Sequence, residues 1–191
     1  MKRGLAVLVL SGMLAWLGAA CGGGGGGGPT APPTPPPPPP PDPVSFSAAG
    51  SPGEMTIHLT KADGTATEVL RLEVRASQFA GLYGVGFDLN YPTDLLNYRG
   101  GSQTEAGFLS GDGSRTEILA RQPTDGTVIV GLSRLGDVGG VEGSGVLLTL
   151  DFTAVNNGSG SISFSANTAF DGDGDRLDDA VWQAGTVEVN L

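Results

Sequence analysis

The chain has 191 residues, a formal net charge of −10 and a single cysteine, Cys21. An acidic surface repels nucleic-acid phosphates and anionic lipid head groups, so the charge argues against nucleic acid or a bare membrane surface as partner. One cysteine excludes disulfides and cysteine-based zinc sites within the chain.

The N-terminal segment has the layout of a secretory signal peptide. Lys2 and Arg3 precede an apolar run over residues 5–16, and small residues lead to Cys21. We therefore predict a lipoprotein signal peptide over residues 1–20 and lipidation of Cys21. The protein is then exported and lipid-anchored to the bacterial cell envelope, at the outer membrane on its periplasmic or surface side. It contacts the membrane through the lipid alone.

The segment after Cys21 is composed almost entirely of glycine and proline. Glycines occupy residues 22–28, and a proline-rich stretch reaches Pro43. Such a composition cannot bury apolar surface, so we predict a disordered tether over residues 21–43. The proline run over residues 35–41 favours a stiff polyproline II rod that rises about 3.1 Å per residue. A spacer of this kind suits a bulky or external partner for one domain at 44–191.

The remaining sequence alternates apolar and polar residues over short stretches that are separated by turn dipeptides. Asp112-Gly113, Asp125-Gly126 and Asn157-Gly158 are typical turns between strands. Strands with one apolar face must pack as two sheets, so we predict an all-β fold. The expected architecture is a two-sheet jelly-roll or immunoglobulin-like β-sandwich of eight to nine strands. Its predicted inward residues include Leu70, Leu72, Val74, Tyr83, Val85, Phe87, Leu89, Tyr91, Val128, Val130, Leu132, Val146, Leu148, Leu150 and Phe152.

Catalytic motifs do not emerge from the sequence. The one histidine, His58, alternates with Thr56 and Thr60 and is predicted to face solvent on a strand. No serine-centred elbow, Walker loop or histidine pair accompanies it. Because no nucleophile, base and orienting group can be assembled, we predict that the protein is not an enzyme.

An acidic stretch near the C-terminus is the candidate metal site. Its aspartates at alternate positions can offer the oxygen ligands that calcium prefers. The match to an EF-hand loop fails where Arg176 replaces the tight-turn glycine and where Trp182 replaces the final glutamate. The simpler alternative is a soluble acidic turn that binds no metal. Calcium is the one cofactor that the sequence suggests. The candidate ligands are Asp171, Asp173, Asp175, Asp178 and Asp179.

Six segments together resemble the cohesin domain family. The most specific is residues 143–152, a Gly-x-Gly-Val-Leu-x-x-Leu-x-Phe strand, and residues 84–96 resemble the family's aromatic strand with its tyrosine. The likeness covers nearly all of residues 55–191. The other segments are residues 106–110, 125–130, 169–175 and 185–189.

The resemblance implies a nine-stranded jelly roll that acts as a receptor for dockerin modules. In dockerin-binding cohesins, outward residues on the strand before the tyrosine contact the dockerin, and those positions here hold Gly84 and Gly86. The alternative is an ordinary solvated sheet face. The candidate partner-binding residues are Gly84, Gly86, Asp88, Asn90, Ile129, Gly131 and Ser133.

Three functions are consistent with these features. The first is a lipid-anchored binding module, cohesin-like, that recognises a dockerin-type or other protein module in polysaccharide handling. The second is a carbohydrate-binding module, although sugar platforms need exposed aromatic rings. Trp182 is the one tryptophan after the signal peptide, and Tyr83 and Tyr91 are expected to face inward. The third is a structural envelope lipoprotein.

Overall fold

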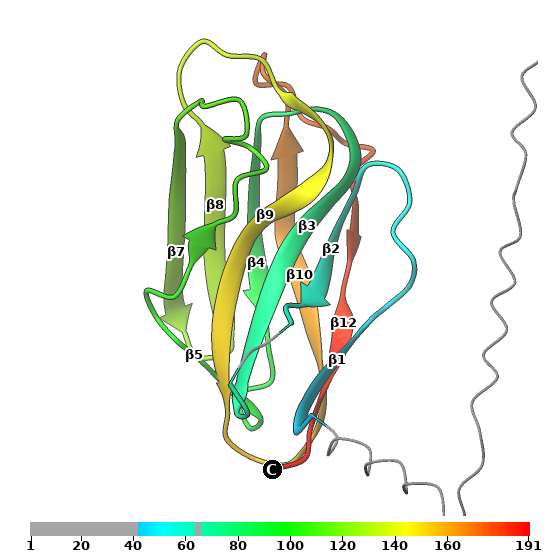
Figure 1. The fold of residues 1–191 in the computed structure, drawn as a ribbon, viewed down its shortest axis with the longest axis vertical. Coiled ribbons are helices and arrows are strands. Elements are labelled where there is room, and N and C mark those ends of the chain that lie inside the picture. The colour runs from blue at the N-terminus through cyan, green and yellow to red at the C-terminus, as the bar shows by residue number, and fades with distance from the viewer. Residues whose placement is uncertain (1–41, 64–65) are drawn as a thin grey trace, which may run out of the picture. The chain divides into compact units, whose positions relative to one another are not determined.

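The computed structural model describes residues 42–63 and 66–191, and every element in this part of the chain is a strand (Figure 1). The predicted signal peptide, Cys21 and nearly all of the predicted tether lie outside the described residues. Within the described ranges, no helix is long and apolar enough to span a bilayer.

Twelve strands run antiparallel to their neighbours, except that β11 runs parallel to β2. They are β1 (Val44–Ala48), β2 (Thr56–Lys61), β3 (Val69–Leu82), β4 (Gly84–Asn90), β5 (Leu96–Tyr98), β6 (Thr104–Glu105), β7 (Thr116–Thr124), β8 (Thr127–Arg134), β9 (Val141–Ala154), β10 (Gly158–Phe170), β11 (Val181–Gln183) and β12 (Gly185–Val189).

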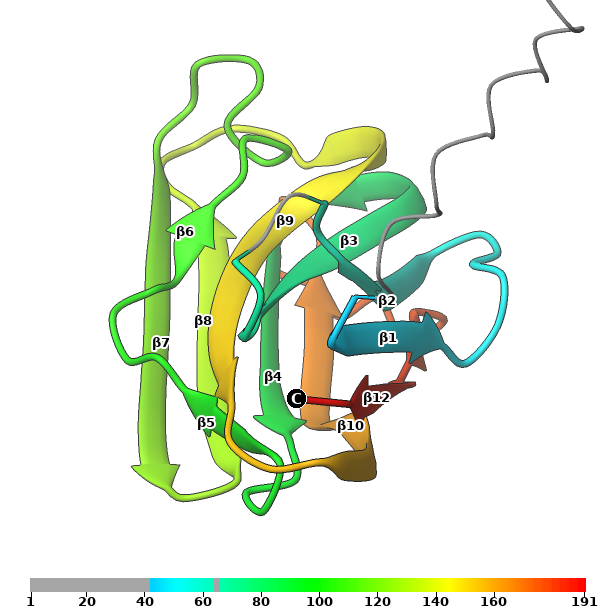
Figure 2. The ribbon, with the colours of Figure 1, turned by 60° about the horizontal axis from the view of Figure 1, so that its bottom comes forward.

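The strands form two sheets packed face to face, which confirms the predicted all-β sandwich (Figures 1 and 2). The β4–β8 sheet has the order β1-β12-β10-β4-β8-β7, and the β3–β9 sheet has the order β11-β2-β3-β9-β5. The short strand β6, visible in Figure 2, pairs with β9. The predicted count of eight to nine strands is too low because β5, β6 and β11 have only two or three residues each.

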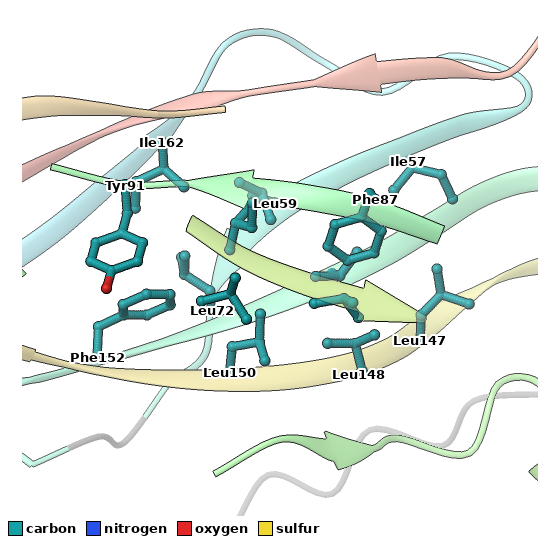
Figure 3. Close-up of a cluster of buried hydrophobic side chains, with 14 of the residues drawn as sticks. Ile57, Leu59, Leu72, Phe87, Tyr91, Leu147, Leu148, Leu150, Phe152 and Ile162 are labelled. Carbon is teal, nitrogen blue, oxygen red and sulfur yellow. The ribbon is translucent and has the colours of Figure 1, made fainter. Parts of the chain in front are cut away.

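The core lies between the sheets and is built from the alternating apolar residues, as predicted (Figure 3). Leu72 of β3, Leu89 of β4 and Leu150 of β9 are fully buried. The rings of Tyr91 and Phe152 meet edge to face, with centroids 5.1 Å apart. These contacts fix the β4–β8 sheet over the β3–β9 sheet and leave its other side outward.

The alternation along β9 changes at Leu147, where the structure corrects the predicted pattern. Leu148 pairs with Val74 and Val146 pairs with Arg75, so Leu147 is an extra residue that has no partner on β3. Such a β-bulge reverses which side chains face the core on its far side. Leu147, labelled in Figure 3, is therefore fully buried, whereas Val146, predicted to face inward, is only half-buried.

His58 also departs from the prediction of a solvent-facing residue, because it is only 7% exposed. It lies on β2 between two neighbours in register, Gln183 of β11 and Arg75 of β3. The connection from β1 to β2 reaches this region, since Gln183 Nε2 donates to the carbonyl of Ser51 at 3.3 Å. Within the described residues, His58 Nδ1 has no hydrogen-bond partner. Burial lowers the pKa of His58, and the positive charge of Arg75 lowers it further.

A buried arginine that sequence reasoning missed ties the β6–β7 connection to the sandwich. Arg134 ends β8, is 2% exposed, and donates from Nη2 to Asp112 Oδ2 at 2.6 Å and to Ser114 Oγ at 2.9 Å. Its Nη1 donates to the carbonyl of Leu109. The hydrogen bond from Arg134 holds the pKa of Asp112 well below its ordinary value.

Candidate protein-binding face

The seven predicted partner-binding residues come together on the outer side of the β4–β8 sheet. Gly84 lies opposite Ser133, Gly86 opposite Gly131, and Asp88 opposite Ile129, while Asn90 lies opposite Thr127. Residues directly opposite in an antiparallel pair share a face, and alternate residues along a strand repeat it. Since Val85, Phe87 and Leu89 point into the core, the seven point outward.

Two further strands extend this surface, which we name the four-strand face: the outward side of β10, β4, β8 and β7. On the β10 side, Thr168 lies opposite Gly86, and Ser165 accepts a hydrogen bond from Asn90 Nδ2 at 2.8 Å. On the β7 side, Leu119 lies opposite Gly131 and is 54% exposed. Sequence reasoning missed Leu119, although the alternation of half-buried and exposed residues along β7 follows the same period-2 rule.

A cavity of about 620 Å³ occupies one end of the four-strand face, and we name it the glycine hollow. Its floor is formed by Gly84, Gly86 and Gly131. Apolar walls come from Leu119 and Phe170, and the acidic rim comes from Glu117 of β7 with Asp171 and Asp173 of the β10–β11 connection. The hollow thus combines an open backbone floor with apolar sides and negative charge.

Steric crowding does not require glycine at two of the floor positions. A Cβ on Gly131 would meet no atom within 4 Å, and one on Gly86 would meet Thr168 Cγ2 at an ordinary 3.5 Å. Neither residue has a positive φ. By contrast, a Cβ on Gly84 would lie 3.1 Å from the carbonyl oxygen of Leu132. Glycine inside a strand weakens the sheet and often marks a place where a ligand or another backbone comes close. The open space at Gly86 and Gly131 is consistent with such close approach by a partner.

The aromatic residues divide between the core and this end of the sandwich. Tyr91 is buried as predicted, but the prediction that Tyr83 faces inward is wrong. Tyr83 precedes β4, is half-buried, lines the glycine hollow, and donates from its hydroxyl to the carbonyl of Gly136 at 2.8 Å. Trp182 packs into the aromatic cluster of Phe87 and Phe164, with ring centroids 5.7 and 5.1 Å away. Its ring is therefore not laid open as a sugar-stacking platform.

The acidic β10–β11 connection is held by its own hydrogen bonds. Asp171 Oδ1 accepts from the backbone N–H of Asp173 at 3.0 Å and of Asp175 at 2.9 Å. Arg176 Nε donates to Asp178 Oδ1 at 3.3 Å. In residues 42–63 and 66–191, no three histidine, cysteine or acidic side chains are gathered as a metal would need. The arrangement does not fit a calcium cage, and calcium binding stays a prediction.

Close glycine contacts position this acidic connection beside the hollow. A Cβ on Gly172 would lie 3.0 Å from the backbone nitrogen of Gly140 in the β8–β9 connection. A Cβ on Gly140 would lie 1.9 Å from the carbonyl oxygen of Gly81 near the end of β3, so a side chain there is sterically excluded. Two connections and the end of β3 are thus stacked through glycines at one end of the sandwich. These contacts hold the β10–β11 connection, and with it the acidic rim, beside the glycine hollow.

Solved cohesin structures share this fold at low sequence identity. The second type II cohesin module of the adaptor scaffoldin ScaA from Acetivibrio cellulolyticus has 13% identity and a TM-score of 0.55 over 75% of this chain and 88% of that one. The cohesin module of a Clostridium perfringens family 33 glycoside hydrolase has 11% identity and a TM-score of 0.52, over 77% and 96%. The sixth cohesin of Acetivibrio cellulolyticus scaffoldin B, solved in complex with a Cel5 dockerin, has 19% identity and a TM-score of 0.52, over 77% and 99%.

The sequence itself carries the assignment to a family. No curated protein matches the chain. Residues 55–189, which span all strands but β1, match the model of the cohesin domain. The resemblance noted from the sequence is thereby confirmed, and the chain belongs to the cohesin family.

Proposed function

We propose that this protein is a receptor for a dockerin-type protein module, which it binds across the four-strand face. The observation that carries the proposal is the glycine pair on the two middle strands of that face, Gly86 opposite Gly131. With no side chain at either position, a partner can approach the backbone of two adjacent strands. Family membership supports the same function, and so does a fold shared with a cohesin that was solved with a dockerin bound.

The chemistry of the site supports binding rather than catalysis. The chain's one histidine is buried on the β3–β9 sheet, away from the glycine hollow. Among the residues that line the hollow, neither a histidine nor a cysteine accompanies the acidic groups. A receptor role needs none of these groups, because affinity comes from surface complementarity and a few well-packed contacts.

Two finer parts of the proposal concern the setting of the receptor. We place it on the cell envelope, anchored by a lipid on Cys21, and we assign it a role in polysaccharide handling through the module that it binds. Direct glycan binding is the competing function. It is disfavoured because Tyr91 and Trp182 pack in the core region rather than forming an exposed ring platform.

The receptor function is tested by titrating the protein with each dockerin module encoded in the source genome. We expect at least one module to bind, and Asp88→Arg and Ile129→Arg to weaken it while the domain stays folded. Glu68→Arg makes the same charge change as Asp88→Arg on an exposed residue just before β3 and should leave the affinity unchanged. If no module binds while insoluble glycans do, or if Glu68→Arg is as damaging as Asp88→Arg, the proposal is wrong.

The lipid anchor is tested separately by cell fractionation. We expect the wild-type protein in the membrane fraction and Cys21→Ser in the soluble fraction, because the acyl chains attach to that sulfur. A Cys21→Ser protein that stays equally membrane-bound would contradict the anchor and leave the receptor function untouched.

A further inference from the structure

We propose that the glycine hollow is a socket for one arginine or lysine side chain of the bound module. The inference rests on the proposed receptor function, since the hollow opens on the four-strand face, and it names the group that occupies this site. The apolar stem of the side chain would lie along the floor and walls, and its cationic head would meet the acidic rim.

The apolar part of the hollow fits a long methylene stem. Leu119 is one of few large hydrophobic side chains exposed in the described residues, and it lies beside the floor glycine Gly131. Phe170, at the end of β10, lies opposite Gly84 on the other side of the floor. Lysine and arginine cover apolar surface with their stems while keeping the charged head at its edge. A volume of about 620 Å³ is ample for one such side chain and the ordered water around it.

The acidic part of the hollow selects a cation. Glu117, Asp171 and Asp173 contribute three carboxylates to its lining, and no lysine or arginine is among the described residues that line it. Arg176, the nearest basic residue along the chain, is paired with Asp178. Asp171 Oδ1 accepts hydrogen bonds from two backbone N–H groups, which hold this carboxylate at the rim. A cationic head therefore enters a field that nothing in the lining neutralises, whereas an anionic group is repelled.

An arginine or lysine side chain fits both the apolar part and the acidic part of the hollow better than other occupants do. A purely apolar side chain would leave three carboxylates facing it without a counter-charge. A free inorganic cation would leave the apolar walls uncovered, and the described carboxylates are not gathered into a metal site. A guanidinium can also bind a carboxylate through two parallel N–H donors, so arginine is the stronger of the two candidates.

The socket can be probed without the partner by nuclear magnetic resonance of the full chain. The probe is N-acetyl-arginine methylamide, with N-acetyl-norleucine methylamide as the neutral control of similar length. We expect the arginine compound to shift the amide signals of Gly84, Gly86 and Gly131 with a dissociation constant on the order of 1–10 mM. Raising the salt concentration from about 0.05 M to about 0.5 M should weaken it several-fold.

Variants assign the binding to the two halves of the socket. Gly131→Phe fills the floor, and we expect it to abolish the shifts, while Gly100→Phe adds the same ring at an exposed site that has open space around it. The double variant Glu117→Gln and Asp173→Asn should weaken binding at least tenfold, and Glu68→Gln should not. Equal binding of the norleucine compound, no shifts at tens of millimolar, or shifts confined to other residues would overturn the socket.

The outcome is separable from that of the receptor function. If a dockerin binds and Gly131→Phe abolishes binding while the rim variant leaves it intact, the socket is wrong and the receptor stands. If the arginine compound binds in the hollow but no dockerin binds, the receptor function is wrong and the socket stands.

Discussion

Gly86 on β4 lies directly opposite Gly131 on β8, so two neighbouring strands lack side chains at the same level of an exposed sheet. Glycine at a strand interior costs conformational entropy and gives up cross-strand packing. Because a Cβ fits at both positions without a clash, the fold itself does not need this pair. The relationship therefore supports the proposal that a partner lies against the sheet at this place.

The first prediction is that Gly86→Arg abolishes partner binding without unfolding the domain. The new side chain would lie over the floor of the glycine hollow, while Val85 and Phe87 keep their places in the core. We expect the affinity for the bound dockerin module to fall by about 30-fold or more, the size of a hot-spot loss of about 2 kcal/mol. Calorimetric titration measures it, and circular dichroism checks the fold.

Gly100→Arg is the matched control for this prediction. Gly100 is exposed in the connection after β5, a Cβ at this position would meet no atom within 4 Å, and its φ is not positive. The control should bind like the wild type. Full affinity in Gly86→Arg would show that recognition lies away from this glycine pair, in the connections at the ends of the four-strand face.

The second prediction concerns the glycine stack that positions the acidic rim. Gly140→Ala would place its methyl group 1.9 Å from the carbonyl oxygen of Gly81, so the backbone must shift. We expect it to lower the free energy of unfolding by about 1–3 kcal/mol, as overpacked sites do. The neighbouring Gly139→Ala meets nothing within 4 Å and should be nearly neutral. Urea denaturation of both variants measures the difference, and equal stability would contradict the contact.

The strand alternation could be predicted from the sequence because each strand has one face in the core. That rule correctly predicts the inward residues of β4 and β8, and hence the outward set that includes Asp88 and Ile129. It fails at Leu147, since a bulge on β9 depends on pairing with β3, which lies far earlier in the chain. It fails at His58 because the neighbouring β11 and the β1–β2 connection bury that side of β2. A period-2 pattern along one strand carries no information about which distant segments of the chain will bury that strand.

The glycine hollow could be predicted only in part. Its floor could be predicted, because Gly84, Gly86 and Gly131 fall on one face by alternation and pairing. Its walls and rim come from Leu119 and from the β10–β11 connection, which the glycine stack brings to the same end of the sandwich. In the described part of the chain the aspartates of that connection are not gathered into a metal cluster, and calcium binding there stays a prediction. They are spread along a connection whose shape is set by backbone contacts.

The third prediction separates a hydrogen-bonded acidic connection from one that needs calcium. Asp171→Asn keeps an oxygen that can accept from the N–H groups of Asp173 and Asp175, whereas Asp171→Ala removes it. We expect the alanine variant to lose about 0.5–1.5 kcal/mol and the asparagine variant much less, because a hydrogen bond and not a charge is needed. Hydrogen bonding alone would leave the melting temperature of all three proteins unchanged at millimolar calcium. A calcium-dependent rise in the wild type, lost in both variants, would instead establish the metal site.

The fourth prediction is that His58 makes stability depend on pH. Burial lowers the pKa of His58 in the folded protein, the charge of Arg75 on β3 lowers it further, and the nearby backbone of Thr56 opposes both. Glu73 forms an ion pair with Arg75 at 2.6 Å, which partly offsets the positive charge of Arg75. Gln183, the neighbour of His58 on β11, is neutral. The folded state thus favours the neutral imidazole. Its contribution is fully present above the unfolded pKa of about 6.5 and is lost as the pH falls through the folded pKa.

His58→Gln removes this titration and provides the control. Across the range below about pH 6.5, we expect the wild type to lose up to about 1.4 kcal/mol for each pH unit that separates the two pKa values, and the variant to stay flat over the same interval. Chemical denaturation at a series of pH values measures both proteins, and the pH-dependent shifts of the imidazole resonances report its folded pKa directly. Carboxylates such as Asp42 and Asp112, whose pKa values are lowered by Lys61 and Arg134, titrate at much lower pH and affect both proteins alike. Parallel stability curves for wild type and variant would show that His58 keeps its charge in the folded state, and that its neighbours on β3 and β11 leave it access to water.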